Sequence, residues 1–339
     1  MGLSSRRAFT LVDLVFIVAA VALLAALVAP AVSRVRSVAL ADKEKAAARL
    51  MHKSWAMYAE DNREKLLPAS GHWDWVHPSA PPGPNTPRLQ PRDPFRADST
   101  IDGTAAKFWT AFLMWQAPMR TDQVQVDSAT RTTFDARTPQ PNSVSQGFTQ
   151  YGNNSKPAAY IMHPSVGMNG VYVGGAYTHG AFRASPTTGP NPMQSGGRYY
   201  VTSMSDVRTP DSLMVFASSR GGDVINSTDF FGYGASNPDF GTQRPGYWLV
   251  TPPKAHPRGR GTAFAPTSLG GAWGSTTNNT FDPVRVPSYW GMLDARSGGA
   301  VMTVMIDGHS EAQTLTQLRD MRKWSNYATS ADWSFTPGP

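Results

Sequence analysis

Histidine and aspartate side chains gather at one point of the chain, in the run HWDWVH. His72 and His77 have the chemistry of metal ligands, and Asp74 lies between them. A metal site needs three or four ligands, each oriented by further hydrogen bonds, and no third ligand follows nearby. The two tryptophans in the run fit a packed loop equally well. The sequence therefore favours a loop without a metal.

Residues that could support catalysis do not form a recognisable pattern elsewhere. The chain has no G-x-S-x-G elbow, H-E-x-x-H pair or phosphate-binding P-loop. Paired glycines at 174–175, 221–222 and 270–271 lack the strand-to-helix context of a nucleotide site and indicate turns. Cysteine is absent, which excludes disulfides, thiolate metal sites and cysteine nucleophiles. We therefore expect no enzymatic activity.

The formal charge of +7 raises the question of a nucleic-acid partner. Much of the basic excess lies in the N-terminal part of the chain, from Arg6 to Lys65. The rest carries no basic run with interleaved aromatic residues. We therefore expect no binding to nucleic acid.

An apolar segment near the N-terminus indicates where the chain resides. Leu14 to Val32 contains no charge and approaches the roughly 20 residues that cross a bilayer core. Arg6 and Arg7 precede it, which favours a cytoplasmic N-terminus. A cleaved secretory signal is the alternative, but its apolar core is usually shorter. The sequence predicts a single-pass helix in the inner (cytoplasmic) membrane, with the following domain periplasmic or extracellular.

The residues from Arg7 to Asp13, RAFTLVD, resemble the processing signal of type IV prepilins. The resemblance implies that prepilin peptidase cuts between Ala8 and Phe9 and methylates the new amine. Asp13 would then neutralise the amine of Phe9 when helices pack in a filament. Pro30, which lacks a backbone donor, would kink or locally melt the helix. The family usually has Gly before the cut and Glu at the fifth mature position, where this chain has Ala8 and Asp13.

The helical pattern continues beyond the apolar segment. Apolar residues recur at three- and four-residue steps among charged ones, and this stripe should pack on the head. Its members are Ala47, Leu50, Met51, Trp55 and Tyr58. The expected division is a leader (1–8), a transmembrane helix (9–32), an amphipathic continuation of that helix (33–66) and a globular β-rich head (67–339).

Within the head, the pattern predicts strands, turns and short helices. Residues 108–114 indicate a short buried helix, and residues 213–217 and 301–306 indicate core strands. The expected fold class is α+β, with a long N-terminal transmembrane helix packed on an antiparallel sheet. Further assignments are strand-like segments at 160–173 and 199–201, surface loops over 218–285, an extended segment at 309–314 and a helix at 315–324.

The C-terminal part carries a second resemblance. Asp307 and Gly308 resemble part of the C-terminal signature of a large pseudopilin-like family, in which a His, nine further residues and Asp-Gly are followed by a strand. Ser297 stands where that His would be, so the signature is degenerate. A tight turn without chemistry explains Asp-Gly equally well.

Calcium is one cofactor to consider, because some major pseudopilins hold a calcium ion in a loop of the head. Asp223, Asp229 and Asp239 lie in Gly- and Asn-rich loops and could supply carboxylate oxygens. They lack a recognisable ligand spacing. We therefore expect no cofactor, with calcium as the exception to consider.

Together these features predict a pilin-like subunit of a type II secretion pseudopilus or a related type IV filament. Its expected partners are prepilin peptidase, other pilin-like subunits and the membrane. The alternative is a membrane-anchored extracytoplasmic domain that binds carbohydrate or cargo, or acts as an enzyme, and that uses a pilin-type signal.

Overall fold

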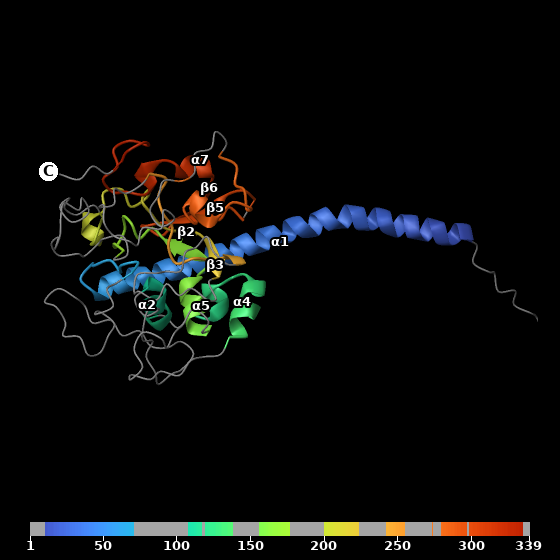
Figure 1. The fold of residues 1–339 in the computed structure, drawn as a ribbon, viewed down its shortest axis with the longest axis horizontal. Coiled ribbons are helices and arrows are strands. Elements are labelled where there is room, and N and C mark those ends of the chain that lie inside the picture. Colours follow the sequence, from blue (N-terminus) through green and yellow to red (C-terminus); the bar gives the residue numbers. More distant parts are fainter. Residues whose placement is uncertain are drawn as a thin grey trace, which may run out of the picture.

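The structure is a computed structural model of the 339-residue chain. It describes residues 11–70, 108–116, 119–137, 156–176, 200–223, 242–254, 273, 279–296 and 298–334. One long helix projects from a head, and the C-terminal part of the same helix runs through that head (Figure 1).

Helix α1 (Leu11–Asp61) is a single α-helix of 51 residues. Its sequence is rich in alanine and leucine, which favour helix, and it contains no glycine. The backbone stays helical through Pro30, so the expected local melting does not occur, and the helix curves only gently (Figure 1). Arg63 and Glu64 end it, because both adopt left-handed backbone angles, φ 55° and 63°. The helix therefore stops before the expected residue 66.

The prediction of a transmembrane helix is wrong. Within the described residues, no helix is both long enough and apolar enough to cross a membrane.

The α+β class and the antiparallel sheet are confirmed. Four strands pair in the order β1-β2-β5-β6, and every pair is antiparallel. The central strands β2 and β5 are mostly apolar and every residue in them is buried, as expected for the middle of a sheet. The strands are β1 (Val166–Met168), β2 (Met214–Ser218), β5 (Val301–Met305) and β6 (Ser310–Gln313).

The assignment of residues 218–285 to surface loops is wrong in part. Strands β3 (Arg220–Asp223) and β4 (Thr242–Pro245) pair antiparallel within it. The residues that follow β4, Tyr247 to Val250, are fully buried. Their aromatic and aliphatic area belongs to the core, which outweighs the loop character of the flanking glycines and prolines.

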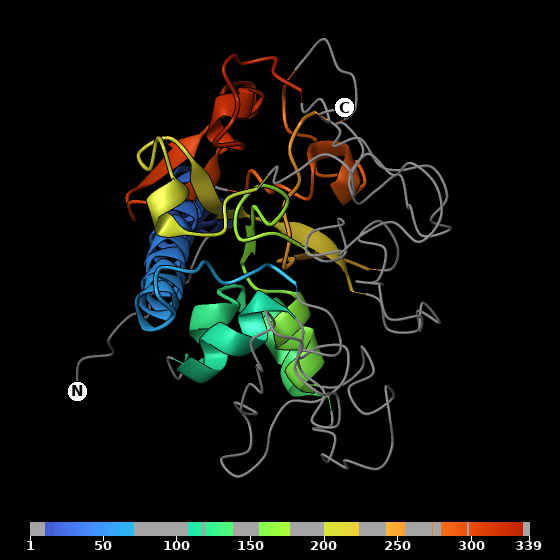
Figure 2. The ribbon, with the colours of Figure 1, turned by 90° about the vertical axis from the view of Figure 1, so that its left-hand side faces the viewer.

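Short helices complete the head. Viewed from the end of the molecule opposite the stem (Figure 2), the C-terminal hairpin of β5 and β6 lies on one side of α1 and helices α2 to α5 lie on the other. Residues 160–162, expected as strand, are the last turn of α5. The helices are α2 (Trp109–Gln116), α3 (Thr121–Val124), α4 (Ser128–Asp135), α5 (Lys156–Met162) and α7 (Leu315–Leu318), with 3-10 turns η4 (Met204–Asp206), η6 (Pro287–Trp290) and η7 (Met321–Lys323).

The core forms around the apolar stripe of α1, as predicted. Met51, Trp55 and Tyr58 are buried, and α1 contacts β2, β5, α2 and α3. The ring centroids of Trp55 and Phe216 lie 6.3 Å apart in an edge-to-face arrangement, and Trp109 packs on Phe216 at 4.9 Å. The C-terminal third of α1 is therefore an internal element of the head.

Candidate functional site

The N-terminal two thirds of α1, residues 11–43, is the stem of the molecule and carries exposed apolar side chains. Leu11 is 79% exposed, Phe16 72% and Val35 69%. Single exposed apolar residues are normal on a protein surface, but a continuous set of this size marks an interaction surface. The other large members are Val12, Leu14, Val15, Ile17, Val18, Val21, Leu23, Leu24, Leu27, Val28, Val32 and Val38.

Two of the predicted assembly residues lie on this stem. The positions of Asp13 and Pro30 belong to the helical backbone of α1. Their side chains are outside the described part of the structure, as are Ala8 and Phe9 at the predicted cleavage point. Cleavage between Ala8 and Phe9 and the pairing of Asp13 with an amine stay predictions.

A buried ion pair lies where the stem enters the head. An Oε1 atom of Glu44 on α1 is 2.7 Å from Nη2 of Arg296, and the Glu44 side chain is fully buried. The contact is an ion pair by distance, because neither carboxylate oxygen has an aligned hydrogen-bond donor within the described residues. Asp294 lies on the other side, with Oδ2 3.5 Å from Nη1 of Arg296. The stem-head junction therefore contains charge that water does not reach.

Burial dominates the electrostatics of this ion pair. It raises the pKa of the Glu44 carboxyl above its usual value, and the Arg296 guanidinium only partly opposes this. For Arg296, burial pushes the pKa down, but Glu44 and Asp294 raise it overall. The desolvation of Glu44 thus outweighs its attraction to the arginine.

The Asp307-Gly308 turn of the family signature docks directly on α1. Nε2 of His52 lies 2.8 Å from the carbonyl oxygen of Ile306, and Arg49 Nε donates to Ser310 Oγ at 3.1 Å. Gly308 has a φ of 90°, and a Cβ there would come within 3.0 Å of the His52 ring. The turn therefore allows close packing of the β5-β6 hairpin on the helix.

The Asp307 carboxylate of that turn binds a residue of the same hairpin, His309. Asp307 Oδ1 accepts a hydrogen bond from the backbone N–H of His309 at 3.0 Å and lies 2.7 Å from His309 Nδ1. These bonds fix a tight turn and assemble no catalytic group. Ser297, the third signature residue, is outside the described part of the structure.

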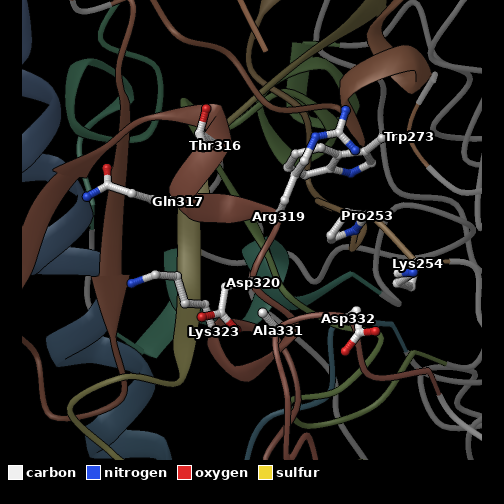
Figure 3. A pocket seen from close by; sticks show the side chains of 10 residues that line it. All are labelled: Pro253, Lys254, Trp273, Thr316, Gln317, Arg319, Asp320, Lys323, Ala331 and Asp332. Atoms are coloured by element: carbon white, nitrogen blue, oxygen red, sulfur yellow. The ribbon is translucent and has the colours of Figure 1, made fainter. Parts of the chain in front are cut away.

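An open pocket of about 740 Å³ lies at the C-terminal side of the head (Figure 3). Arg319 lies over the rings of Trp273 and Trp290, at 5.6 and 6.0 Å from their centroids, and its Nε donates to Asn279 Oδ1. Trp273 itself is buried and donates its indole N–H to the Thr251 carbonyl. The pocket is lined by Pro253, Lys254, Trp273, Thr316, Gln317, Arg319, Asp320, Lys323, Ala331 and Asp332.

This arrangement bears on the alternative of a carbohydrate-binding head. Sugars stack on exposed aromatic faces, whereas Arg319 already covers the indole of Trp273. The carboxylate of Asp320 is held by Arg322 in a two-pronged pair. The described residues that line this pocket therefore bind one another or neighbouring residues and stabilise the head. They do not present an exposed aromatic face on which a sugar could stack.

Metal binding finds no support among the described residues. They contain no group of three or more His, Cys, Asp or Glu side chains arranged to hold an ion. Asp223 is the last residue of β3, but its side chain is not described. The other candidates, Asp229, Asp239, His72, Asp74 and His77, lie outside the described residues.

Comparisons of the chain with protein-family models, with curated proteins and with solved structures each gave no match. The features that bear on function are therefore the stem, the stem-head junction at Glu44 and the Asp307-Gly308 turn.

Sequence reasoning missed Glu44, His52 and Arg296. A usable signal existed for Glu44, because the steps from 44 to 48, 51 and 55 continue the buried stripe of α1 toward the N-terminus. A charged residue on such a stripe predicts a buried partner. Nothing in the sequence near Arg296 identifies that partner, because the two residues are far apart in the chain and meet only through the fold.

Proposed function

We propose that this chain is a pilin-like subunit of a type II secretion pseudopilus or a related type IV filament. The observation that carries the proposal is the division of α1. The stem part of one continuous helix carries exposed apolar side chains, and the remaining third is the central helix of an α+β head. Such a subunit has an assembly surface and a globular domain joined by one rigid element.

Burial of the stem supplies the driving force for assembly. A helix that is apolar on all sides is stable only when other helices or lipid cover it. Burying one large aliphatic side chain is worth about 1.5–3 kcal/mol, and the stem carries more than a dozen. Stems packed side by side would cover these side chains.

The N-terminal residues give this association its register. In the proposal, prepilin peptidase cuts between Ala8 and Phe9 and methylates the new amine, and Asp13 pairs with that amine in a neighbouring subunit. A carboxylate placed among apolar stems is unfavourable unless it meets such a partner, so only the correct stagger satisfies it. The head lies outside the cytoplasm, the role is assembly and not catalysis, and no cofactor is required.

The mass of the mature chain tests processing. Intact mass and N-terminal peptide mapping of the protein from its native cells should show a chain that begins at Phe9 and is one methyl group heavier. A chain that begins at Met1 or Gly2 contradicts the proposal.

Asp13→Ala tests assembly. We expect this variant to be cleaved normally and to give a much lower yield of filaments, because the amine of the neighbour loses its partner. Asp42→Ala is the matched control, since Asp42 is an exposed acidic residue on the same helix. Filament yield at the wild-type level from Asp13→Ala would disprove the pairing.

A further inference from the structure

Glu44 lies where the exposed stem of α1 enters the head. Among the described side chains of α1, it is the first from the N-terminus that is fully buried. The stem before it is bare, and the stripe after it, from Ala47 to Ala59, is packed in the head. Any change in the angle between stem and head must move Glu44.

The partner of Glu44 is tied to several parts of the sheet at once. Nη2 of Arg296 donates to the carbonyl oxygens of Ser165, just before β1, and Ser219, just after β2, at 2.6 and 3.1 Å. Arg296 itself belongs to the turn that leads into β5. This one nitrogen therefore lies within ion-pair or hydrogen-bond distance of α1 and of the residues that flank β1 and β2.

Stability does not explain this arrangement. Removing two charges from water is costly, and the attraction within a buried pair often fails to repay it. A buried ion pair is better suited to selecting one geometry, because only that geometry satisfies both charges. We propose that Glu44 and Arg296 form a brace that fixes the direction of the stem relative to the head.

The length of the stem shows why a brace at this point is effective. From Leu11 to Lys43 the helix extends about 50 Å, so a tilt of about 10° at Glu44 moves its tip by about 9 Å, nearly one helix diameter. The polar contacts described between α1 and the C-terminal hairpin, Arg49 with Ser310 and His52 with Ile306, lie between one and just over two turns further inside. A contact at the mouth of the head has a longer lever arm against tilting.

The brace can be tested by measuring distances between spin labels in the full chain in detergent. The protein has no cysteine, so Val28→Cys on the stem and Thr329→Cys on the head take labels at those two sites alone. Both positions are exposed. We expect one narrow distance distribution with the brace intact, and a distribution at least about twofold wider in Glu44→Gln, which keeps the shape of the side chain but loses its charge.

Two further variants show whether the effect belongs to the Glu44–Arg296 ion pair or to any loss of charge near it. Lys43→Gln removes a neighbouring exposed charge and should keep the narrow distribution. In Arg296→Met the positive charge and the contacts of Nη2 are lost, so the distribution should widen, and this variant also serves if Glu44→Gln does not fold. Narrow distributions in the folded Glu44 and Arg296 variants would overturn the brace.

The brace itself does not depend on filament formation, and only its effect on assembly rests on the proposed function. If the brace directs assembly, Glu44→Gln lowers filament yield even though its head remains folded, whereas Lys43→Gln keeps the wild-type yield. A wild-type chain that gives a narrow distance distribution but no filaments would remove the proposed function and leave the brace intact.

Discussion

Gly308 has no side chain because the fold leaves no room for one. Its φ of 90° is strained for any residue with a Cβ, and that atom would press on the His52 ring. Gly308→Ala should therefore lower the free energy of unfolding by about 1–3 kcal/mol, measured by urea denaturation. Gly298→Ala is the matched control, since Gly298 also has a positive φ but open space around it, and should cost about 1 kcal/mol. Equal losses would show that packing on His52 contributes nothing.

His52 makes the stability of the head depend on pH. Burial lowers its pKa from the usual 6.5, so the unfolded chain takes up a proton before the folded one does. The contribution of neutral His52 to the free energy of unfolding is complete above pH 6.5. It is lost as the pH falls below that value, at up to about 1.4 kcal/mol per pH unit. Urea midpoints at pH 7.5 and 5.5 should differ less in His52→Gln than in the wild type. Parallel pH profiles would contradict this role.

Glu44 acts with the opposite sign. Because burial raises its pKa, the folded state binds this proton more tightly, and the group costs stability as the pH rises above the usual carboxyl value. Glu44 thus opposes folding at neutral pH, where the proposed brace must operate. The predictability of such residues from sequence is uneven: the helical stripe shows that position 44 is buried, but only the fold brings it to Arg296.

At the scale of elements, α1 has two faces within the head. Trp55 is fully buried against Phe216, whereas Met57, two residues along, is 40% exposed. Trp55→Ala should lower the free energy of unfolding by about 3–5 kcal/mol, and Met57→Ala by less than about 0.5 kcal/mol, as measured by thermal or urea denaturation. A similar loss in both variants would mean that α1 is not packed in this orientation.

Strands whose sequences are strongly apolar could be predicted. Strands that form only because they pair with each other could not. The runs LMVFA and VMTVMI predicted β2 and β5, because a strand buried on both faces is apolar throughout. Strands β3 and β4 have the sequences RGGD and TQRP, which carry no strand pattern and form only through contact with each other. Likewise α5 contains Tyr160 and Ile161, whose strand preference is overridden by packing on its neighbours.

At the scale of the whole molecule, the bare stem should control association. A chain without residues 1–38 lacks the large exposed apolar side chains of the stem but keeps Glu44 and the buried stripe. We expect this shortened chain to be a monomer in detergent-free buffer by light scattering, whereas the full chain should self-associate there. The unfolding midpoint in urea should change little, because the core clusters around α1 remain. Equal association of both chains would assign the contact surface to the head.

The continuity of α1 also determines how the molecule responds to force. No loop separates the stem from the part of the helix in the core, so tension applied to the stem reaches the central sheet directly. Such a pull loads the interface in shear, along the helix axis, and Met51, Trp55 and Tyr58 must slip together before the helix leaves the head. A subunit held by its stem would carry load across its entire core and release it in a single step, without unravelling from one end.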